Sequence, residues 1–125
     1  MNIEQREHTL SIGGLRELTA ANAESVRVLA CAAVTPNLRT IEVDLSETTM
    51  MDSFGLGVIT TLYKTASEGN RHGSPAVRLL NPQPPVQQVL ELTRLHHLFE
   101  IVLQTSHAAV NASQQPRAIQ PAATP

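Results

Sequence analysis

The chain has 125 residues, with nine Lys and Arg against eleven Asp and Glu and a formal net charge of −2. This length suits one compact domain, and the charge balance excludes the basic face that direct nucleic-acid binding requires. Because the chain has no Trp, one Tyr and two Phe, its core must be mainly aliphatic. Cys31 is the only cysteine, which excludes an intrachain disulfide and a metal site built from thiolates.

The sequence shows neither a targeting signal nor a membrane-spanning segment. Its first seven residues are mostly polar or charged and do not resemble a signal peptide. No stretch approaches the roughly 18 apolar residues that a spanning helix needs. We therefore expect a cytoplasmic protein without membrane insertion, and a peripheral role beside a membrane partner stays open.

The first third of the chain predicts strands followed by a helix. Residues 8–12 alternate between polar and apolar side chains and precede two glycines, a pattern typical of a strand that ends in a turn. Residues near Ile3 are expected to form a short edge strand beside it. A helix is expected to start within residues 19–22 and to end before Pro36. Its expected buried face carries Val26, Leu29, Ala30 and Ala33, at helical spacing.

The rest of the chain predicts two more strand–helix units. Residues 41–45 and 76–80 are expected to be strands, and residues 48–51 are expected to connect the first of them to a helix that opens at Asp52. A third helix is expected from Pro84, and a last strand or extended segment over residues 98–103. The expected buried faces of the two helices are Leu56, Ile59, Thr60 and Tyr63, and Val86, Val89, Leu90 and Thr93.

This order predicts an α/β fold with a mixed, mostly parallel sheet, because strands separated by helices pair in parallel through right-handed crossovers. The alternation in residues 41–45 and 77–79 indicates that the helices lie mainly on one face of the sheet. We expect one domain over residues 1–103. Residues 104–125, which are rich in Ala, Pro and Gln, are expected to be a disordered tail.

Asp52 and Ser53 stand where a strand and its turn lead into the second predicted helix. Aspartate is a favoured N-cap, because its carboxylate accepts hydrogen bonds from the free amides of the first turn. A serine there is exposed, as a protein kinase requires, and lies at the positive end of the helix dipole. A phosphate would add about −1.5 to −2 charges, which the helix end would tolerate and Asp52 would oppose. From these residues alone, an ordinary helix cap is the simpler interpretation.

Several motifs, in order, resemble the STAS family, named for sulphate transporters and anti-sigma-factor antagonists. The strand end Val43-Asp44-Leu45-Ser46 is followed by Met51-Asp52-Ser53-Phe54-Gly55-Leu56-Gly57, then by Leu79-Leu80-Asn81-Pro82, by residues 86–93 and by Leu98-Phe99-Glu100-Ile101. The resemblance spans residues 1–103 and implies a STAS-like fold.

The resemblance to the antagonists implies partner switching in bacterial transcription control. Ser53 would be phosphorylated by an anti-sigma-factor serine kinase of the GHKL type. The unphosphorylated chain would bind this kinase and release a sigma factor, phosphorylation would weaken the complex, and a serine phosphatase would restore it. The kinase holds the ATP, so no cofactor and no enzymatic activity are implied for this chain. The residues implied in partner binding are Arg16, Asp52, Ser53, Phe54 and Gly55.

Two residues depart from the family pattern. Phe54 stands where a small or hydroxyl residue is common, and we interpret it as a partner contact in preference to a core residue. Arg16 stands where an acid is frequent, which predicts a divergent partner because charge complementarity sets specificity. These departures keep a second function open, a non-switching accessory subunit bound to the ATPase of a lipid-exporting ABC transporter. A signalling-scaffold role is a weaker third possibility.

No metal site or catalytic site is expected. No two histidines are spaced at i, i+3 or i, i+4, as helical metal ligands would be; they are His8, His72, His96, His97 and His107. A hydrolase nucleophile at Ser53 would require Gly-x-Ser-x-Gly, and Met51 occupies the first glycine position. A response-regulator receiver would require paired acids after the first strand, which residues 8–14 lack.

Overall fold

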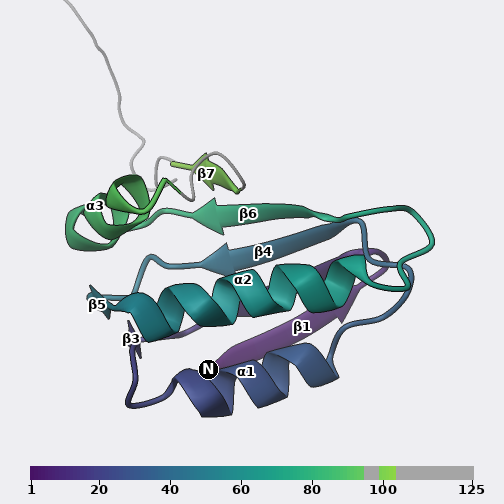
Figure 1. Ribbon diagram of the computed structural model, residues 1–125, viewed down its shortest axis with the longest axis horizontal. Helices are drawn as coiled ribbons and strands as arrows, with labels where there is room; N and C mark the ends of the chain where they lie inside the picture. The colour runs from purple at the N-terminus through teal and green to yellow at the C-terminus, as the bar shows by residue number, and fades with distance from the viewer. Residues whose placement is uncertain (95–98, 104–125) are drawn as a thin grey trace, which may run out of the picture.

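The computed structural model describes residues 1–94 and 99–103 (Figure 1). The strands are β1 (Asn2–Arg6), β2 (Thr9–Gly13), β3 (Glu17–Leu18), β4 (Thr40–Asp44), β5 (Met50–Met51), β6 (Ala76–Leu80) and β7 (Glu100–Val102). The helices are α1 (Ala23–Ala32), α2 (Ser53–Ser67) and α3 (Pro84–Leu92).

The main sheet has five strands in the order β1-β2-β4-β6-β7. β1 pairs antiparallel with β2, and the other neighbours pair in parallel. Parallel neighbours require a crossover, and α1, α2 and α3 lie in these connections. The mixed, mostly parallel sheet and the edge strand near Ile3 are therefore confirmed.

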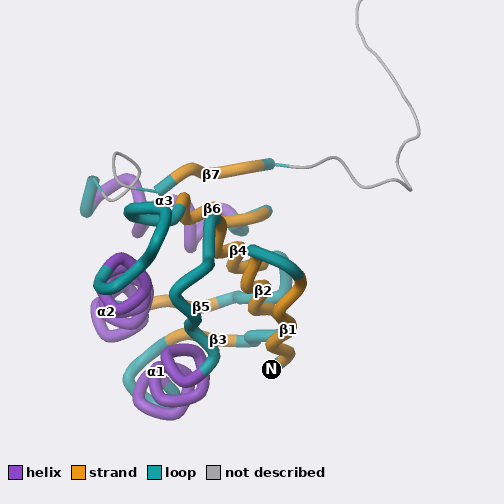
Figure 2. The backbone as a smooth tube through the Cα atoms, turned by 90° about the vertical axis from the view of Figure 1, so that its right-hand side faces the viewer, coloured by secondary structure: helices purple, strands orange, loops and turns teal. Residues whose placement is uncertain are grey.

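One face of the sheet is buried and the other is not. In β4, Ile41 and Val43 are buried, whereas the residues between and beside them are half-buried. β2 shows the same alternation, with Leu10 and Ile12 buried. Figure 2 shows α1 and α2 on the same side of the sheet. The expected placement of the helices on one face is confirmed.

The helix-free face carries a row of charges across three neighbouring strands. Arg78 on β6 lies 3.5 Å from Glu42 on β4 and 3.4 Å from Glu100 on β7. The pairing register places these three residues directly opposite one another. Opposite charges at such cross-strand positions favour this register.

The buried face of α1 differs from the predicted one at Leu29, which is 52% exposed. Val26 and Ala30 are buried as expected, and Ala23, one turn earlier, is buried with them. The buried side chains Ala23, Val26 and Ala30 share one side of α1, and Leu29 lies beyond the edge of that side. The spacing of Val26, Leu29, Ala30 and Ala33 predicted a face that includes Leu29 and leaves out Ala23.

Residues 48–51, expected to be only a connection, contain β5, which pairs in parallel with β3. Neither two-residue strand is long enough to show an alternating pattern. Thr48, just before β5, is fully buried and donates a hydrogen bond of 2.6 Å to the carbonyl of Leu15. Asp52 N lies 3.4 Å from the carbonyl of Leu18, so β3 and β5 together fix the approach to α2.

The later elements follow the prediction closely. β6 covers the expected residues, and α3 begins at Pro84. Val86 and Leu90 are buried as expected, whereas Thr93, predicted on the same face, follows the last residue of α3 and is exposed. The last strand is Glu100–Val102, within the expected range, and Leu98 lies outside the described residues. The expected tail, residues 104–125, also lies outside them. No helix in the described part of the chain is long and apolar enough to cross a membrane.

The Thr48 hydrogen bond gives a stability test. Replacing Thr48 with Val keeps the shape but removes the donor to the Leu15 carbonyl, so we expect unfolding free energy to fall by about 1 to 2 kcal/mol in urea titrations. Thr49 makes a similar bond of 3.2 Å to the Arg16 carbonyl at an exposed position. Thr49→Val should therefore lower the unfolding free energy less than Thr48→Val does. An equal loss in the two variants would contradict the assigned role of the buried hydrogen bond.

Candidate functional site at the start of α2

Asp52 is the N-cap of α2, as predicted, with extended backbone angles. Its Oδ1 accepts hydrogen bonds from the amides of Phe54 at 2.9 Å and Gly55 at 3.1 Å. Its Oδ2 accepts a third, from the amide of Ala20 at 3.0 Å. The carboxylate thus joins the start of α2 to the loop before α1, a contact that the sequence alone did not predict.

These hydrogen bonds lower the pKa of Asp52 below its ordinary value. The Ala20 amide makes the largest contribution, the amides of Gly55 and Phe54 add to it, and desolvation opposes it. Each amide stabilises the ionised carboxylate more than the neutral acid. Asp52 is therefore a fixed negative charge beside Ser53 at neutral pH.

Ser53 is the first residue of α2, and its side chain is exposed, as expected. No hydrogen bond to its hydroxyl is found within residues 1–94 and 99–103. The hydroxyl is thus accessible, and its modification would break no hydrogen bond within these residues. A serine in this state can accept a phosphoryl group without first leaving a packed position.

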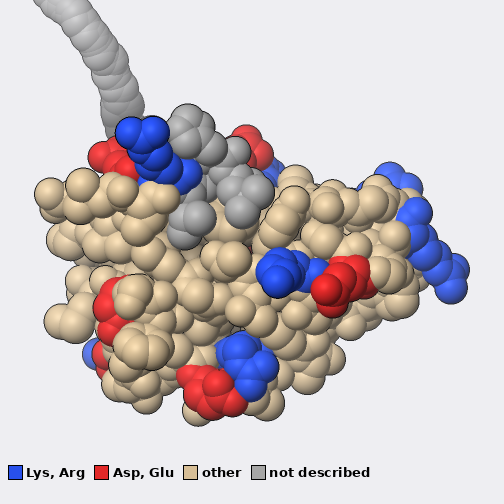
Figure 3. Space-filling model, in the orientation of Figure 1, with Lys and Arg blue, Asp and Glu red and all other residues tan. Residues whose placement is uncertain are grey.

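A hollow of about 470 Å³ lies between α1 and α2 beside Ser53. Ala20, Ala23, Glu24 and Arg27 line it on the α1 side, and Ser53, Phe54, Gly57, Val58 and Thr61 line it on the α2 side. Phe54 is 62% exposed, so its ring lies outside the core. In Figure 3 the surface over α1 and α2 is largely tan, with one adjoining pair of red and blue patches over each helix. The hollow therefore offers apolar contact next to the serine.

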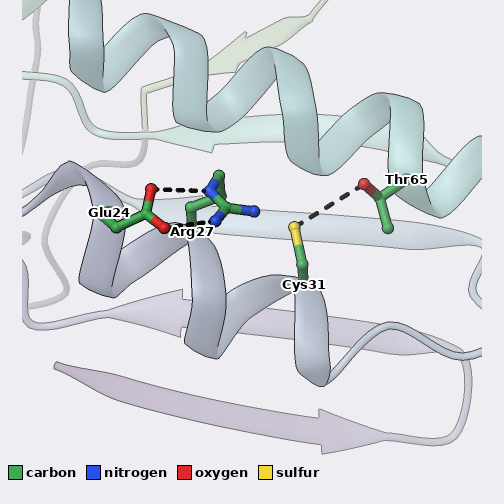
Figure 4. Close-up of polar contacts among 4 residues, drawn as sticks. All are labelled: Glu24, Arg27, Cys31 and Thr65. Atoms are coloured by element: carbon green, nitrogen blue, oxygen red, sulfur yellow. Dashed lines mark hydrogen bonds and ion pairs between the residues drawn. The ribbon is translucent and has the colours of Figure 1, made fainter.

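Glu24 and Arg27 form the ion pair at this hollow. Nε and Nη2 of Arg27 donate to the two carboxylate oxygens of Glu24 at 3.1 and 2.5 Å (Figure 4). The hydrogen bond first, and the opposite charge second, lower the pKa of Glu24 and raise the pKa of Arg27. The i, i+3 spacing could have predicted the pair, but its place beside Ser53 follows only from the packing of α1 against α2.

The two glycines of α2 meet opposite surroundings. A Cβ at Gly55 would lie 2.0 Å from the carbonyl oxygen of Leu18, and Gly55 is buried. A Cβ at Gly57 would meet nothing within 4 Å. Gly55 is therefore required for the close packing of α2 against Leu18. Gly57 lines an open part of the hollow, where a larger side chain would fit.

Arg16 is exposed in the loop between β2 and β3, and it is not among the residues that line the hollow. Its carbonyl accepts hydrogen bonds from the amide and hydroxyl of Thr49. Arg16 therefore does not share the hollow that Ser53 and Phe54 line at the start of α2.

The histidines do not form a metal centre in the described part of the chain. The rings of His8 and His72, far apart in sequence, meet edge to face with centroids 5.9 Å apart. No group of three or more His, Cys, Asp or Glu side chains that could hold a metal is found within the described residues. Cys31 is half-buried, and its thiol lies 3.9 Å from the hydroxyl of Thr65 (Figure 4).

The Asp52 cap gives a pH-dependent test. Because folding lowers the pKa of this carboxyl, it stabilises the fold above its unfolded pKa, and that stabilisation is lost as the pH falls through the folded pKa. We expect Asp52→Asn to lower the urea midpoint at pH 7, with the difference from wild type shrinking below about pH 4. A difference that stays constant from pH 7 to pH 3 would contradict this role.

The two glycines give a matched stability test. Gly55→Ala forces a methyl group against the Leu18 carbonyl and should destabilise the protein by about 1 to 3 kcal/mol. Gly57→Ala adds a methyl group in open space and should stabilise α2 by up to about 1 kcal/mol, because Ala is the better helix former. Thermal and urea unfolding of both variants measure the contrast, and a destabilised Gly57→Ala would contradict it.

Solved structures resemble the chain over most of its length. A Thermotoga maritima protein assigned as an anti-sigma factor antagonist is 26% identical, with a TM-score of 0.70 over 86% of this chain and 89% of that one. SpoIIAA, a Bacillus cell-fate determinant, gives 22% identity and a TM-score of 0.69 in its unphosphorylated form, over 88% and 92% of the chains. The phosphorylated form of SpoIIAA is 21% identical, with a TM-score of 0.63 over 88% of this chain and 96% of that one.

None of the curated protein sequences compared with the chain is significantly similar to it. The STAS domain family, however, matches residues 1–109, which is most of the chain. The mostly parallel sheet of five strands with its three helices agrees with this match. The chain belongs to the STAS domain family.

Proposed function

We propose that the chain is an anti-sigma-factor antagonist that acts by partner switching in the cytoplasm. Unphosphorylated, it binds an anti-sigma serine kinase of the GHKL type and releases a sigma factor. Phosphorylation of Ser53 weakens the complex, and a serine phosphatase restores it. The observation that carries the proposal is the accessible Ser53 hydroxyl at the first position of α2, beside an ionised N-cap, in a STAS chain whose solved relatives include antagonists.

The chain is a substrate in this scheme and not an enzyme. The Ser53 oxygen attacks the γ-phosphorus of ATP bound by the kinase, and a new O–P bond forms. The bond from the γ-phosphorus to the β,γ-bridging oxygen breaks, ADP leaves, and the hydroxyl proton passes to a general base of the kinase. The phosphatase later transfers the phosphoryl group to water, which regenerates the hydroxyl.

Phosphorylation would change binding and not the fold. The Ser53 side chain is exposed and makes no hydrogen bond within the described residues, so its modification breaks no internal contact. The phosphate adds about −1.5 to −2 charges beside Asp52 and at the edge of the apolar hollow. A partner that covers this surface would have to desolvate that charge, which is costly without a matching cation.

The proposed contact surface comprises Ser53, Phe54 and the hollow that continues to Gly57. An exposed aromatic ring supplies a large apolar contact area at little conformational cost. Gly55 is buried beneath Leu18, so we leave it out of this surface. Asp52 positions the surface by capping α2, and Arg16 would contact only a partner that extends beyond the hollow.

The proposal is tested by incubating the purified chain with its candidate kinase and ATP. We expect one added phosphate, located at Ser53 by mass spectrometry and absent from Ser53→Ala. Ser25, exposed on α1, provides the matched control, and Ser25→Ala should be phosphorylated normally. Ser53→Ala should keep kinase binding, whereas Ser53→Asp should weaken it at least about tenfold, or about 1.4 kcal/mol.

Two results would contradict the proposal. One is the absence of phosphate at Ser53 with a kinase that is active on another substrate. The other is equal binding of that kinase by Ser53→Ala and Ser53→Asp. Stable copurification with a transporter ATPase, and not with a GHKL-type kinase, would support the accessory-subunit alternative instead.

A further inference from the structure

Arg27 and Ser53 belong to different helices but line the same hollow. The Arg27 side chain rises from α1 on the side that faces α2 (Figure 4), and it is 41% exposed. Nε and Nη2 are bound to Glu24, and the remaining guanidinium nitrogen has no dashed contact in Figure 4. A cation with a flexible stem therefore lies in the hollow that the proposed phosphorylation site borders.

The amides of Phe54, Gly55 and Leu56 at the start of α2 are already occupied, which limits what they can offer a phosphate. Asp52 accepts hydrogen bonds from the amides of Phe54 and Gly55, and its backbone carbonyl accepts one from Leu56. A phosphate on Ser53 would have to displace the cap to bind the Phe54 and Gly55 amides. A side-chain cation is therefore the better source of neutralising charge, and Arg16 does not line the hollow.

The present partner of Arg27 holds it weakly. The Glu24 side chain is 76% exposed, and ion pairs of this kind contribute about 0 to 1 kcal/mol to stability. A phosphoserine carries about −1.5 to −2 charges and three acceptor oxygens, and it suits the planar fork of an arginine. A phosphate at the edge of this hollow would therefore compete successfully with Glu24.

We propose that phosphorylation of Ser53 moves Arg27 from Glu24 to the phosphate, so that an ion pair bridges α1 and α2 across the hollow. This inference rests on the proposed function, because it requires phosphate at Ser53. The bridge covers the apolar surface beside Phe54 and leaves Glu24 without its cation. A docking partner then meets a closed, more acidic surface. Arg27 is a positioning residue in this switch.

The test uses full-length protein in which phosphoserine is incorporated at position 53 during synthesis, so that no kinase is needed. The phosphorus resonance is followed by NMR from pH 4 to pH 8. A neighbouring guanidinium stabilises the dianion, so the phosphate should titrate about 0.5 to 1 pH unit lower in the wild type than in Arg27→Gln. The Arg27 Nε–H resonance should also shift when Ser53 carries phosphate.

Two matched variants separate this bridge from general electrostatics. Arg6→Gln removes another exposed arginine with a glutamate neighbour, on β1, and should leave the phosphate titration unchanged. Glu24→Gln frees Arg27 and should lower the phosphate midpoint further. Identical midpoints in wild type and Arg27→Gln, with no shift of the Arg27 resonance, would overturn the inference. A kinase that fails to phosphorylate Ser53 would instead count against the proposed function.

Discussion

The three hydrogen bonds to the Asp52 carboxylate are the constraint on which the site depends. One oxygen caps α2 through the amides of Phe54 and Gly55, and the other holds the Ala20 amide of the loop before α1. A neutral or shorter side chain could not satisfy both elements in this way. The same carboxylate therefore determines where Ser53 points and how the hollow beside it is bounded.

Beside this fixed carboxylate lie residues, Phe54 and Gly57, whose side-chain positions face solvent and not the core. Gly55 is fixed by the Leu18 carbonyl, whereas Gly57, two residues later, faces open space. Phe54, just before Gly55, remains largely exposed. A glycine that weakens a helix and an aromatic ring in solvent both lower stability without a gain inside the chain, which is consistent with a surface shaped for a partner.

Much of the fold was predictable because it depends on local patterns. The alternation of Ile41 and Val43, the proline at the start of α3 and the Asp52 cap all act over a few residues. The β3–β5 pair was not predictable, because two-residue strands carry no periodicity. Leu29 was misplaced because the buried side of α1 is formed by Ala23, Val26 and Ala30, and the helical spacing of the apolar residues also fits a face that includes Leu29. The β3–β5 pairing and the exposure of Leu29 both depend on tertiary packing, which the spacing of apolar residues does not predict.

The same distinction applies to the site. Asp52 and Ser53 are adjacent in sequence, and their arrangement follows from helix capping. Arg27 and Glu24 reach the site only because α1 and α2 both connect parallel strands through crossovers on one face. Such helices lie side by side with their amino termini at the same edge of the sheet. A change of charge at the start of α2 therefore acts directly on the first turns of α1, and the topology itself couples the two helices.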